Sequence, residues 1–174
     1  MDSEKWIIEA LTFKDKLYRF ALRMLGDCEE ASDAVQETYI KLWKMFAQQN
    51  SHSNIEALAM TITKNYCLDQ LKSKLWQSER LEMNSLQQMQ SGNGNGESLL
   101  ELKDAYDTMK QFIGVLPKQQ QMVIHLRDVE QLELNEIASI TGLNENAVRV
   151  NLSRARKTVR QLLTNHYNYE YTGN

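Results

Sequence analysis

Two apolar helical patterns meet at Gly142, and this junction constrains the fold more than any other feature. The apolar residues around it recur at helical spacing and can close a small core between two crossed helices: Leu134, Ile137, Ala138, Ile140, Leu143, Val148 and Leu152. Gly142 supplies the positive φ that a tight turn requires, and the side chain of Asn144 can cap the helix that follows. The pattern predicts a helix-turn-helix.

The second helix of this unit becomes basic along its length, with Glu145 as the only acid before residue 160. Its cations are Arg149, Arg154, Arg156, Lys157 and Arg160. Such a helix fits the major groove of DNA, where its side chains reach base edges and phosphates. The alternative is a solvated basic face, since helix-turn-helix shapes also occur in proteins that do not bind DNA. The turn glycine, the cap, the small Ala138 at the crossing and the clustered cations together favour DNA binding.

The distribution of charge indicates two different partners. The chain has a net charge of −3, which by itself is unusual for a DNA-binding protein. Its acids, however, crowd one early segment, and the last long helix is basic. The acidic segment contains Asp27, Glu29, Glu30, Asp33 and Glu37. Charge segregated in this way suggests that one surface binds nucleic acid and another binds something else.

The first part of the chain, residues 1–80, is predicted to be a bundle of three helices. An apolar stripe over residues 6–24 predicts one helix that ends at Gly26. Asp27 is placed to cap a second helix, with Glu30 as its partner in a capping box. A third helix is expected from Ile55 to about Ser78. No alternating pattern typical of β-strands interrupts these segments.

The second part is predicted to be a separate helical domain over residues 99–170. Residues 81–98 lose the helical periodicity and contain a polar, glycine-rich stretch, which indicates a flexible linker. Helical periodicity resumes at Leu99 and breaks near Gly114, and Pro117 begins the next helix. The predicted fold class is therefore all-α, with two small helical domains joined by a linker and the helix-turn-helix in the second.

Other classes of function find little support. The apolar stretches are too short to span a bilayer and the N-terminus lacks a signal-peptide pattern, so we expect a cytoplasmic protein. Cys28 and Cys67 lack other ligands at metal-binding spacing, and we expect thiols rather than a disulfide, and no metal or cofactor. The histidines His52, His125 and His166 are scattered, with no catalytic arrangement around them. An enzyme is not expected.

Two segments in this order resemble a known family. Residues 26–44 (GDCEEASDAVQETYIKLWK) resemble region 2 of bacterial sigma factors of the extracytoplasmic-function (ECF) group. Residues 116–127 (LPKQQQMVIHLR), with the helix-turn-helix after them, resemble region 4 of the same group. The resemblance implies a promoter-specificity subunit of bacterial RNA polymerase. Its partners would be core polymerase, through the β′ clamp helices and the β subunit, promoter DNA, and an anti-sigma factor, which in many members is membrane-bound.

The resemblance implies that the second helix of region 2 docks on the β′ clamp coiled coil. The residues carried over to this contact are Asp33, Gln36, Glu37, Lys41 and Trp43. Asp33 and Glu37 are four residues apart, so their carboxylates share one helix face and can pair with arginines of a partner. Solvation of the helix N-terminus is the alternative role for acids here, and we prefer it for Glu29 and Glu30.

The next helix resembles the element that reads and opens the −10 promoter element. Its polar and basic face is formed by Thr61, Lys64, Asn65, Lys72 and Lys74. By resemblance, the loop 48–54 would hold a flipped base. Leu58 and Met60 replace an aromatic pair that is common in the family, so stacking on separated strands is expected to be weaker.

The basic helix of region 4 would read the −35 element. By resemblance, Arg149, Val150, Ser153 and Arg154 face the bases, and Arg127, Asn151, Arg156 and Lys157 contact phosphates. Asn146 and Ala147 replace a usual Gly-Thr, and Val150 replaces a common serine, so the preferred DNA sequence cannot be transferred from other members.

A dimeric helix-turn-helix repressor or activator is the main alternative function. It accounts for the second domain, but it leaves the helix of Asp33, Gln36 and Glu37 without a role. Binding to core polymerase separates the two hypotheses, because a dimeric repressor has no need of the polymerase.

Overall fold

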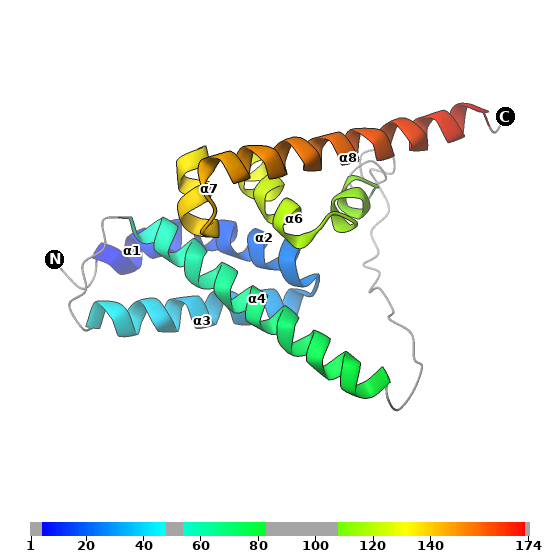
Figure 1. Cartoon of the computed structure of the whole chain (residues 1–174). Helices are drawn as coiled ribbons and strands as arrows, with labels where there is room; N and C mark the ends of the chain where they lie inside the picture. The colour runs from blue at the N-terminus through cyan, green and yellow to red at the C-terminus, as the bar shows by residue number, and fades with distance from the viewer. Residues whose placement is uncertain (1–4, 48–53, 83–107, 173–174) are drawn as a thin grey trace, which may run out of the picture.

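The protein is all-α in the part that the computed structural model describes, residues 5–47, 54–82 and 108–172. The first domain consists of α1 (Lys5–Thr12), α2 (Lys14–Leu25), α3 (Cys28–Ala47) and α4 (Ile55–Glu82). In the second, helical residues 108–114 precede α6 (Lys118–Ile124), the π-helical turn η1 (His125–Val129), α7 (Leu134–Thr141) and α8 (Glu145–Thr172). The two groups of helices lie one above the other, with α3 and α8 on opposite outer sides (Figure 1). The predicted fold class is confirmed.

The predicted start of α3 follows from two adjacent residues. Gly26 adopts a φ of 78° and ends α2 by donating its N–H to the carbonyl of Leu22. The Oδ1 of Asp27 then accepts the N–H groups of Glu29 and Glu30, each at 2.9 Å. The Asp27 cap is therefore confirmed. The Glu30 carboxylate, in contrast, forms a 2.6 Å ion pair with Lys74 of α4 rather than the expected capping box.

The single helix expected over residues 6–24 is in fact two helices. The break lies at Phe13, which has φ −108° and ψ 13° and is buried. Ala10 of α1 and Leu17 of α2 are also buried, so both helices turn their apolar sides to the same core. The Ala10 carbonyl accepts a 2.8 Å hydrogen bond from the hydroxyl of Tyr39 of α3, which fixes α1 across the break. At the other end of this domain, α4 runs to Glu82, beyond the predicted end near Ser78.

The core of the first domain contains one buried polar contact. The hydroxyl groups of Thr38 of α3 and Thr63 of α4 lie 2.8 Å apart, and both residues are fully buried. Each hydroxyl is also within hydrogen-bonding distance of the carbonyl four residues before it. The largest fully buried side chains of this domain belong to the same core: Leu17, Phe20, Met24, Leu42 and Met60. A satisfied polar pair of this kind fixes the register of α3 against α4.

The helix-turn-helix forms as predicted. Gly142 has a φ of 76° and ends α7, and the Oδ1 of Asn144 accepts the N–H of Ala147 at 2.8 Å to cap α8. Ile137 and Ile140 of α7 pack with Val148 of α8 in the buried core. The start of α7 is fixed by Glu136, whose carboxylate accepts the N–H of Glu133 at 2.8 Å.

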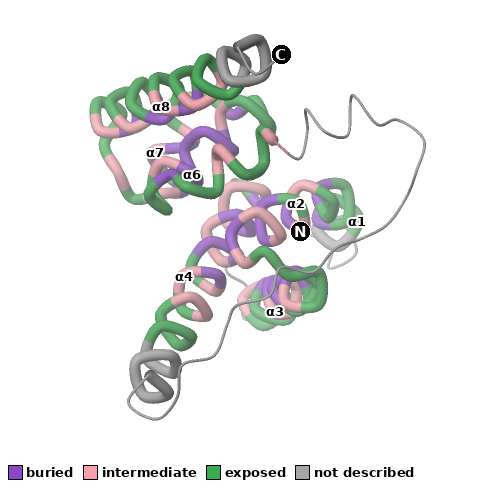
Figure 2. The backbone as a smooth tube through the Cα atoms, turned by 90° about the vertical axis from the view of Figure 1, so that its right-hand side faces the viewer, coloured by how far each residue is buried: buried purple, intermediate pink, exposed green. Residues whose placement is uncertain are grey.

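The two domains pack directly against each other. α7 contacts α4, and α2 contacts both α6 and η1. In Figure 2 the second domain, with α8 outermost, lies against α2 and the first part of α4. A small cavity marks the seam between α4 and α7, lined by Asn54, Glu56, Ala57, Met60, Leu132, Glu136 and Ile140. Lys118 adds a polar contact by donating to the carbonyl of Met24 at 3.3 Å.

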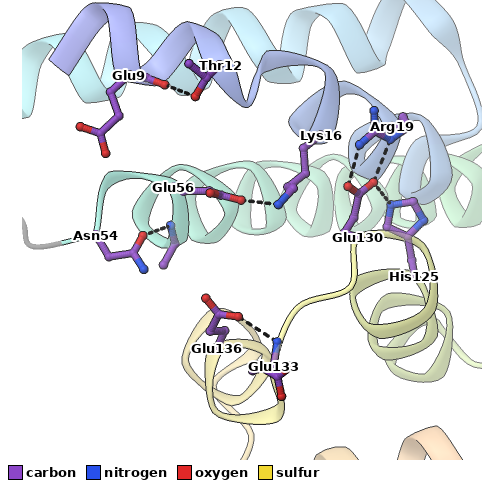
Figure 3. A network of polar contacts seen from close by, with 11 residues as sticks. Glu9, Thr12, Lys16, Arg19, Asn54, Glu56, His125, Glu130, Glu133 and Glu136 are labelled. Atoms are coloured by element: carbon purple, nitrogen blue, oxygen red, sulfur yellow. Dashed lines mark hydrogen bonds and ion pairs between the residues drawn. The ribbon is translucent and has the colours of Figure 1, made fainter. Parts of the chain in front are cut away.

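A buried carboxylate lies at the centre of this contact. The side chain of Glu130 is only 1% exposed, although it follows a surface turn. Arg19 of α2 donates to both of its oxygens, at 2.9 and 2.7 Å, and His125 lies 3.3 Å from Oε1 (Figure 3). The ring of Phe20 packs edge-on against His125, with 5.8 Å between centroids. Burial alone would raise the pKa of Glu130, but the close contact with His125 and the hydrogen bonds from Arg19 lower it to about 2.

This lowered pKa predicts how stability depends on pH. The carboxylate has a pKa of about 2 in the folded protein and of about 4.3 in an unfolded chain. Its contribution to the free energy of unfolding is therefore complete above about pH 5 and is lost as pH falls toward 2. We expect Glu130→Gln to be less stable than the wild type at pH 7, with a difference that shrinks below about pH 4.

Thermal unfolding of both proteins between pH 7 and pH 3 would measure this difference. A gap that stays constant over the whole range would show that the charge on Glu130 does not stabilise the fold.

Candidate functional site

The carried-over acidic residues form one exposed face of α3. Asp33 and Gln36 are exposed and Glu37 is half-buried, while Val35 and Leu42 on the opposite side are buried. Lys41 lies 3.7 Å from the Glu37 carboxylate and 5.9 Å from the ring centroid of Tyr66 in α4. Lys41 therefore lies at the edge of this face, toward α4, where it screens the charge of Glu37.

The same face carries apolar side chains, of which the sequence reasoning found only Trp43. Trp43 is 59% exposed, and Ile40, which was missed, is 47% exposed. Beside Gln36 a groove of about 340 Å³ opens between α1, α2 and α3, lined by Leu11, Lys14, Tyr18, Ser32, Val35, Gln36 and Tyr39. Large apolar residues amid exposed polar ones are typical of a surface that binds another protein. The sequence does contain a signal for Ile40: it lies four residues after Gln36 and four before Lys44, so all three share the polar side of the helix.

The polar residues of α4 are brought together only in part. Asn65 and Lys72 are exposed, whereas Lys64 is only 9% exposed, and burial lowers its pKa. Thr61 donates its hydroxyl to the carbonyl of Ala57 at 2.8 Å, and Lys74 is paired with Glu30. In this arrangement Asn65 and Lys72 are therefore the carried-over residues best placed to meet DNA.

The loop before α4 lies mostly outside the described residues. Of the range 48–54 that was predicted to hold a flipped base, only Asn54 is described. Its Oδ1 accepts the N–H of Ala57 at 2.8 Å and so caps α4.

The residues predicted to face bases lie on one exposed side of α8. This side comprises Arg149, Val150, Ser153, Arg154 and Lys157, all exposed. Behind it, Val148, Leu152 and Ala155 are buried against the rest of the domain. The helix therefore presents a rigid row of donors and cations, with Val150 as its apolar member.

Several of the carried-over cations already have partners within the protein. Arg156 donates its Nε to Asp128 of η1 at 3.1 Å, and this bond raises the pKa of Arg156. Arg127 donates to the carbonyl of Leu132 at 2.7 Å and lies 3.2 Å from Glu133. These contacts attach η1 to α8 and to the start of α7, so Arg127 and Arg156 hold the domain together as well as facing solvent.

The remaining cations differ in their availability. Arg149 is paired with Glu145 at 2.9 Å, but both side chains are about half exposed, so water and salt weaken the pair. Asn151 donates to the carbonyl of Ala147 at 2.9 Å. Among the described residues, Arg154 and Lys157 form no ion pair, which leaves their charge available to an anionic partner.

The described part of the chain offers neither a metal site nor a membrane span. No group of three or more His, Cys, Asp or Glu side chains there could hold a metal ion. None of the described helices combines the length and the hydropathy needed to cross a membrane.

Comparison with protein families identifies two segments of the chain. Residues 11–77 match Sigma-70 region 2, and residues 107–159 match Sigma-70 region 4. The first match contains α2, α3 and most of α4, and the second contains α6, η1, α7 and about half of α8. Together they cover well over half of the chain and include every carried-over residue.

Individual sigma factors are also similar in sequence to this chain. The ECF RNA polymerase sigma factor SigW of Bacillus subtilis is 27% identical, over 87% of this chain and 84% of SigW. The ECF RNA polymerase sigma factor SigE of Mycolicibacterium smegmatis is 26% identical over 87% of this chain, which spans only 59% of that protein.

Solved structures share the fold. The co-crystal structure of the sigma factor RpoE with the anti-sigma factor NepR from Bartonella quintana matches with a TM-score of 0.74. It is 23% identical, and the match covers 92% of this chain and 98% of that one. The structure of CnrH in complex with the cytosolic domain of CnrY matches with a TM-score of 0.65 at 20% identity, over 94% of this chain and 90% of that one.

Proposed function

This chain belongs to the sigma-70 family, in its extracytoplasmic-function group, and we propose that it uses separate surfaces of its two domains to bind core RNA polymerase and promoter DNA. As an RNA polymerase sigma factor it directs transcription from particular promoters. One observation gives the strongest support to two separate binding surfaces. An acidic, partly apolar face on α3 and a basic face on α8 lie on opposite outer sides of the molecule (Figure 1).

The domains divide this work between them. Residues 1–80 would bind core polymerase and the −10 element, and residues 99–170 would bind the −35 element, with 81–98 as the linker. Because α4 extends to Glu82, the first domain includes at least two residues more than the sequence predicted.

Core polymerase would bind the exposed face of α3. Asp33 and Glu37 offer carboxylates one turn apart, which suit arginines on a partner helix. Ile40 and Trp43 add apolar area beside them, and Gln36 connects this face to the groove between α1 and α3. Charges give such an interface its specificity, and buried apolar side chains give much of its affinity.

Promoter DNA would bind α4 and α8 in different ways. On α4, Asn65 and Lys72 would contact the separated strands of the −10 element, with Thr61, Lys64 and Lys74 joining once their present contacts change. On α8, Arg149, Val150, Ser153 and Arg154 would face the bases of the −35 element. Lys157, Asn151, Arg127 and Arg156 would hold the backbone.

An anti-sigma factor is a further proposed partner. The similar structures of RpoE and CnrH contain NepR and the cytosolic domain of CnrY, respectively. We infer that this chain is likewise regulated by a protein that covers its docking surfaces, and that it acts in the cytoplasm. Sigma factors are generally initiation factors without catalytic activity of their own, and we infer the same for this chain.

The α3 face can be tested with a double substitution. Replacing Gln36 by Ala and Glu37 by Arg should weaken binding to core polymerase by about tenfold or more, equivalent to about 1.4 kcal/mol. The reason is that the new cation would face the arginines expected on the partner. Titration of labelled protein with core polymerase would measure the dissociation constant, with circular dichroism to check that the helices are intact.

Glu29→Arg is the matched control. It makes the same change of charge at the start of the same helix, one turn before Asp33. Equal losses in the two variants would mean that net charge, rather than the α3 face, determines the affinity.

Two cations of α8, Arg154 and Lys157, should respond differently to substitution. Arg154→Ala should cost about 1–3 kcal/mol and relax the preference at one promoter position, because the guanidinium would contact a base. Lys157→Ala should weaken binding almost evenly across sequences and lower the salt dependence by about one counterion.

Transcription from a promoter library at two salt concentrations would measure both effects. If both variants lost affinity equally for all promoter sequences, Arg154 would have no role in base recognition. If neither variant changed transcription, the basic side of α8 would be a solvated surface that does not bind DNA.

A further inference from the structure

One cation of α8 is already bound by an acid from a different element. Arg156 donates its Nε to one carboxylate oxygen of Asp128 at 3.1 Å and its Nη2 to the other oxygen. This fork of two N–H groups is the geometry in which a guanidinium binds either a carboxylate or a phosphate. Because Arg156 is proposed to hold the DNA backbone, the Asp128 carboxylate occupies the position on Arg156 that a phosphate of DNA would take.

The fold keeps Asp128 beside α8. Asp128 lies in the π-helical turn η1, whose last part is anchored in the protein. Two residues later, Glu130 is buried and donates its N–H to the carbonyl of His125 at 3.0 Å. The backbone at Asp128 is therefore fixed, and only its short side chain can rotate. The negative charge of Asp128 must then stay close to Arg156 when DNA approaches.

Stability of the fold gives little reason for this ion pair. The side chains of Arg156 and Asp128 are 50% and 37% exposed, and ion pairs with this much contact with water contribute little to the free energy of unfolding. The apolar side of α8 holds the helix in place, since Val148, Leu152 and Ala155 are buried. Loss of the Asp128 charge should therefore leave the packing of α8 intact, so its effect on DNA binding can be measured separately.

The edge of α8 that carries Arg156 has two further arginines. Arg149 lies seven residues before Arg156 and Arg160 lies four after it, so all three share one edge of the helix, and all three are exposed. Arg149 pairs with Glu145 within α8 itself, a weak contact between neighbours on one helix. Arg160 forms no ion pair among the described residues. Arg160 is therefore the unpaired cation with which Arg156 can be compared.

We propose that Asp128 is an internal substitute for a DNA phosphate, which partly neutralises Arg156 and so lowers the affinity of α8 for DNA of every sequence. The inference rests on the proposed function, because it requires that α8 binds DNA. When DNA binds, a phosphate must displace the Asp128 carboxylate, which then lies close to a backbone of the same charge. The base-facing side chains of Val150, Ser153 and Arg154 take no part in this exchange, so Asp128 leaves the preference between sequences unchanged.

Asp128→Asn removes the charge and keeps the size of the side chain. The full-length variant should bind a short labelled duplex of random sequence about three- to tenfold more tightly than the wild type at about 0.1 M salt, as measured by fluorescence anisotropy. Its salt dependence should rise by about one counterion, because Arg156 would neutralise a phosphate without giving up an internal partner. Glu29→Gln, the same change of net charge on α3, is the control and should bind like the wild type. An equal gain in this control would overturn the inference.

A double-mutant cycle shows whether Asp128 acts through Arg156. In an Arg156→Gln background Asp128→Asn should no longer tighten DNA binding, whereas in an Arg160→Gln background most of the gain should remain. If Asp128→Asn left the affinity unchanged or lowered it, or if its gain persisted without Arg156, the inference would be overturned while the proposed function stood. If Arg154→Ala and Lys157→Ala also left DNA binding unchanged, α8 would not bind DNA, and the proposed function would fall together with the inference.

Discussion

The arrangement of the whole molecule depends on how one buried charge is compensated. Glu130 is placed by the π-helical turn η1, and the next residue, Gln131, has a φ of 58°, a conformation that is costly for a residue with a side chain. This local geometry directs the carboxylate inward, toward Arg19 and His125. Because a buried carboxylate without a partner is strongly unfavourable, the first domain is drawn onto the second. The contact between α4 and α7 is a consequence of this packing.

The faces with proposed functions lie away from this contact. The acidic and apolar residues of α3 and the cations of α8 are exposed although the two domains pack against each other. The face of α4 is different, since Lys64 is buried while Asn65 remains exposed. A chain with a net charge of −3 can thus bind DNA, because its cations are concentrated on one helix and its acids on another. Separate placement of charge, rather than total charge, makes both partners compatible with one small protein.

The local features of the fold could be predicted from sequence, and the long-range ones could not. Gly142, Asn144 and Asp27 act through backbone conformation within a few residues, and the structure places each as expected. The break at Phe13 was missed because apolar residues continue at helical spacing across it. The pairing of Arg19 with Glu130 depends on how two domains pack, and no periodicity within either segment contains that information. The roles of Asp33, Arg154 and the other carried-over residues come from resemblance and stay predictions until binding is measured.

Hydrogen–deuterium exchange of the free protein and of its complex with core polymerase tests the central claim most directly. The account predicts that amides of α3 around Gln36 and Glu37 become protected in the complex, since that face is buried by the polymerase. Unchanged exchange in α3 would contradict the docking surface.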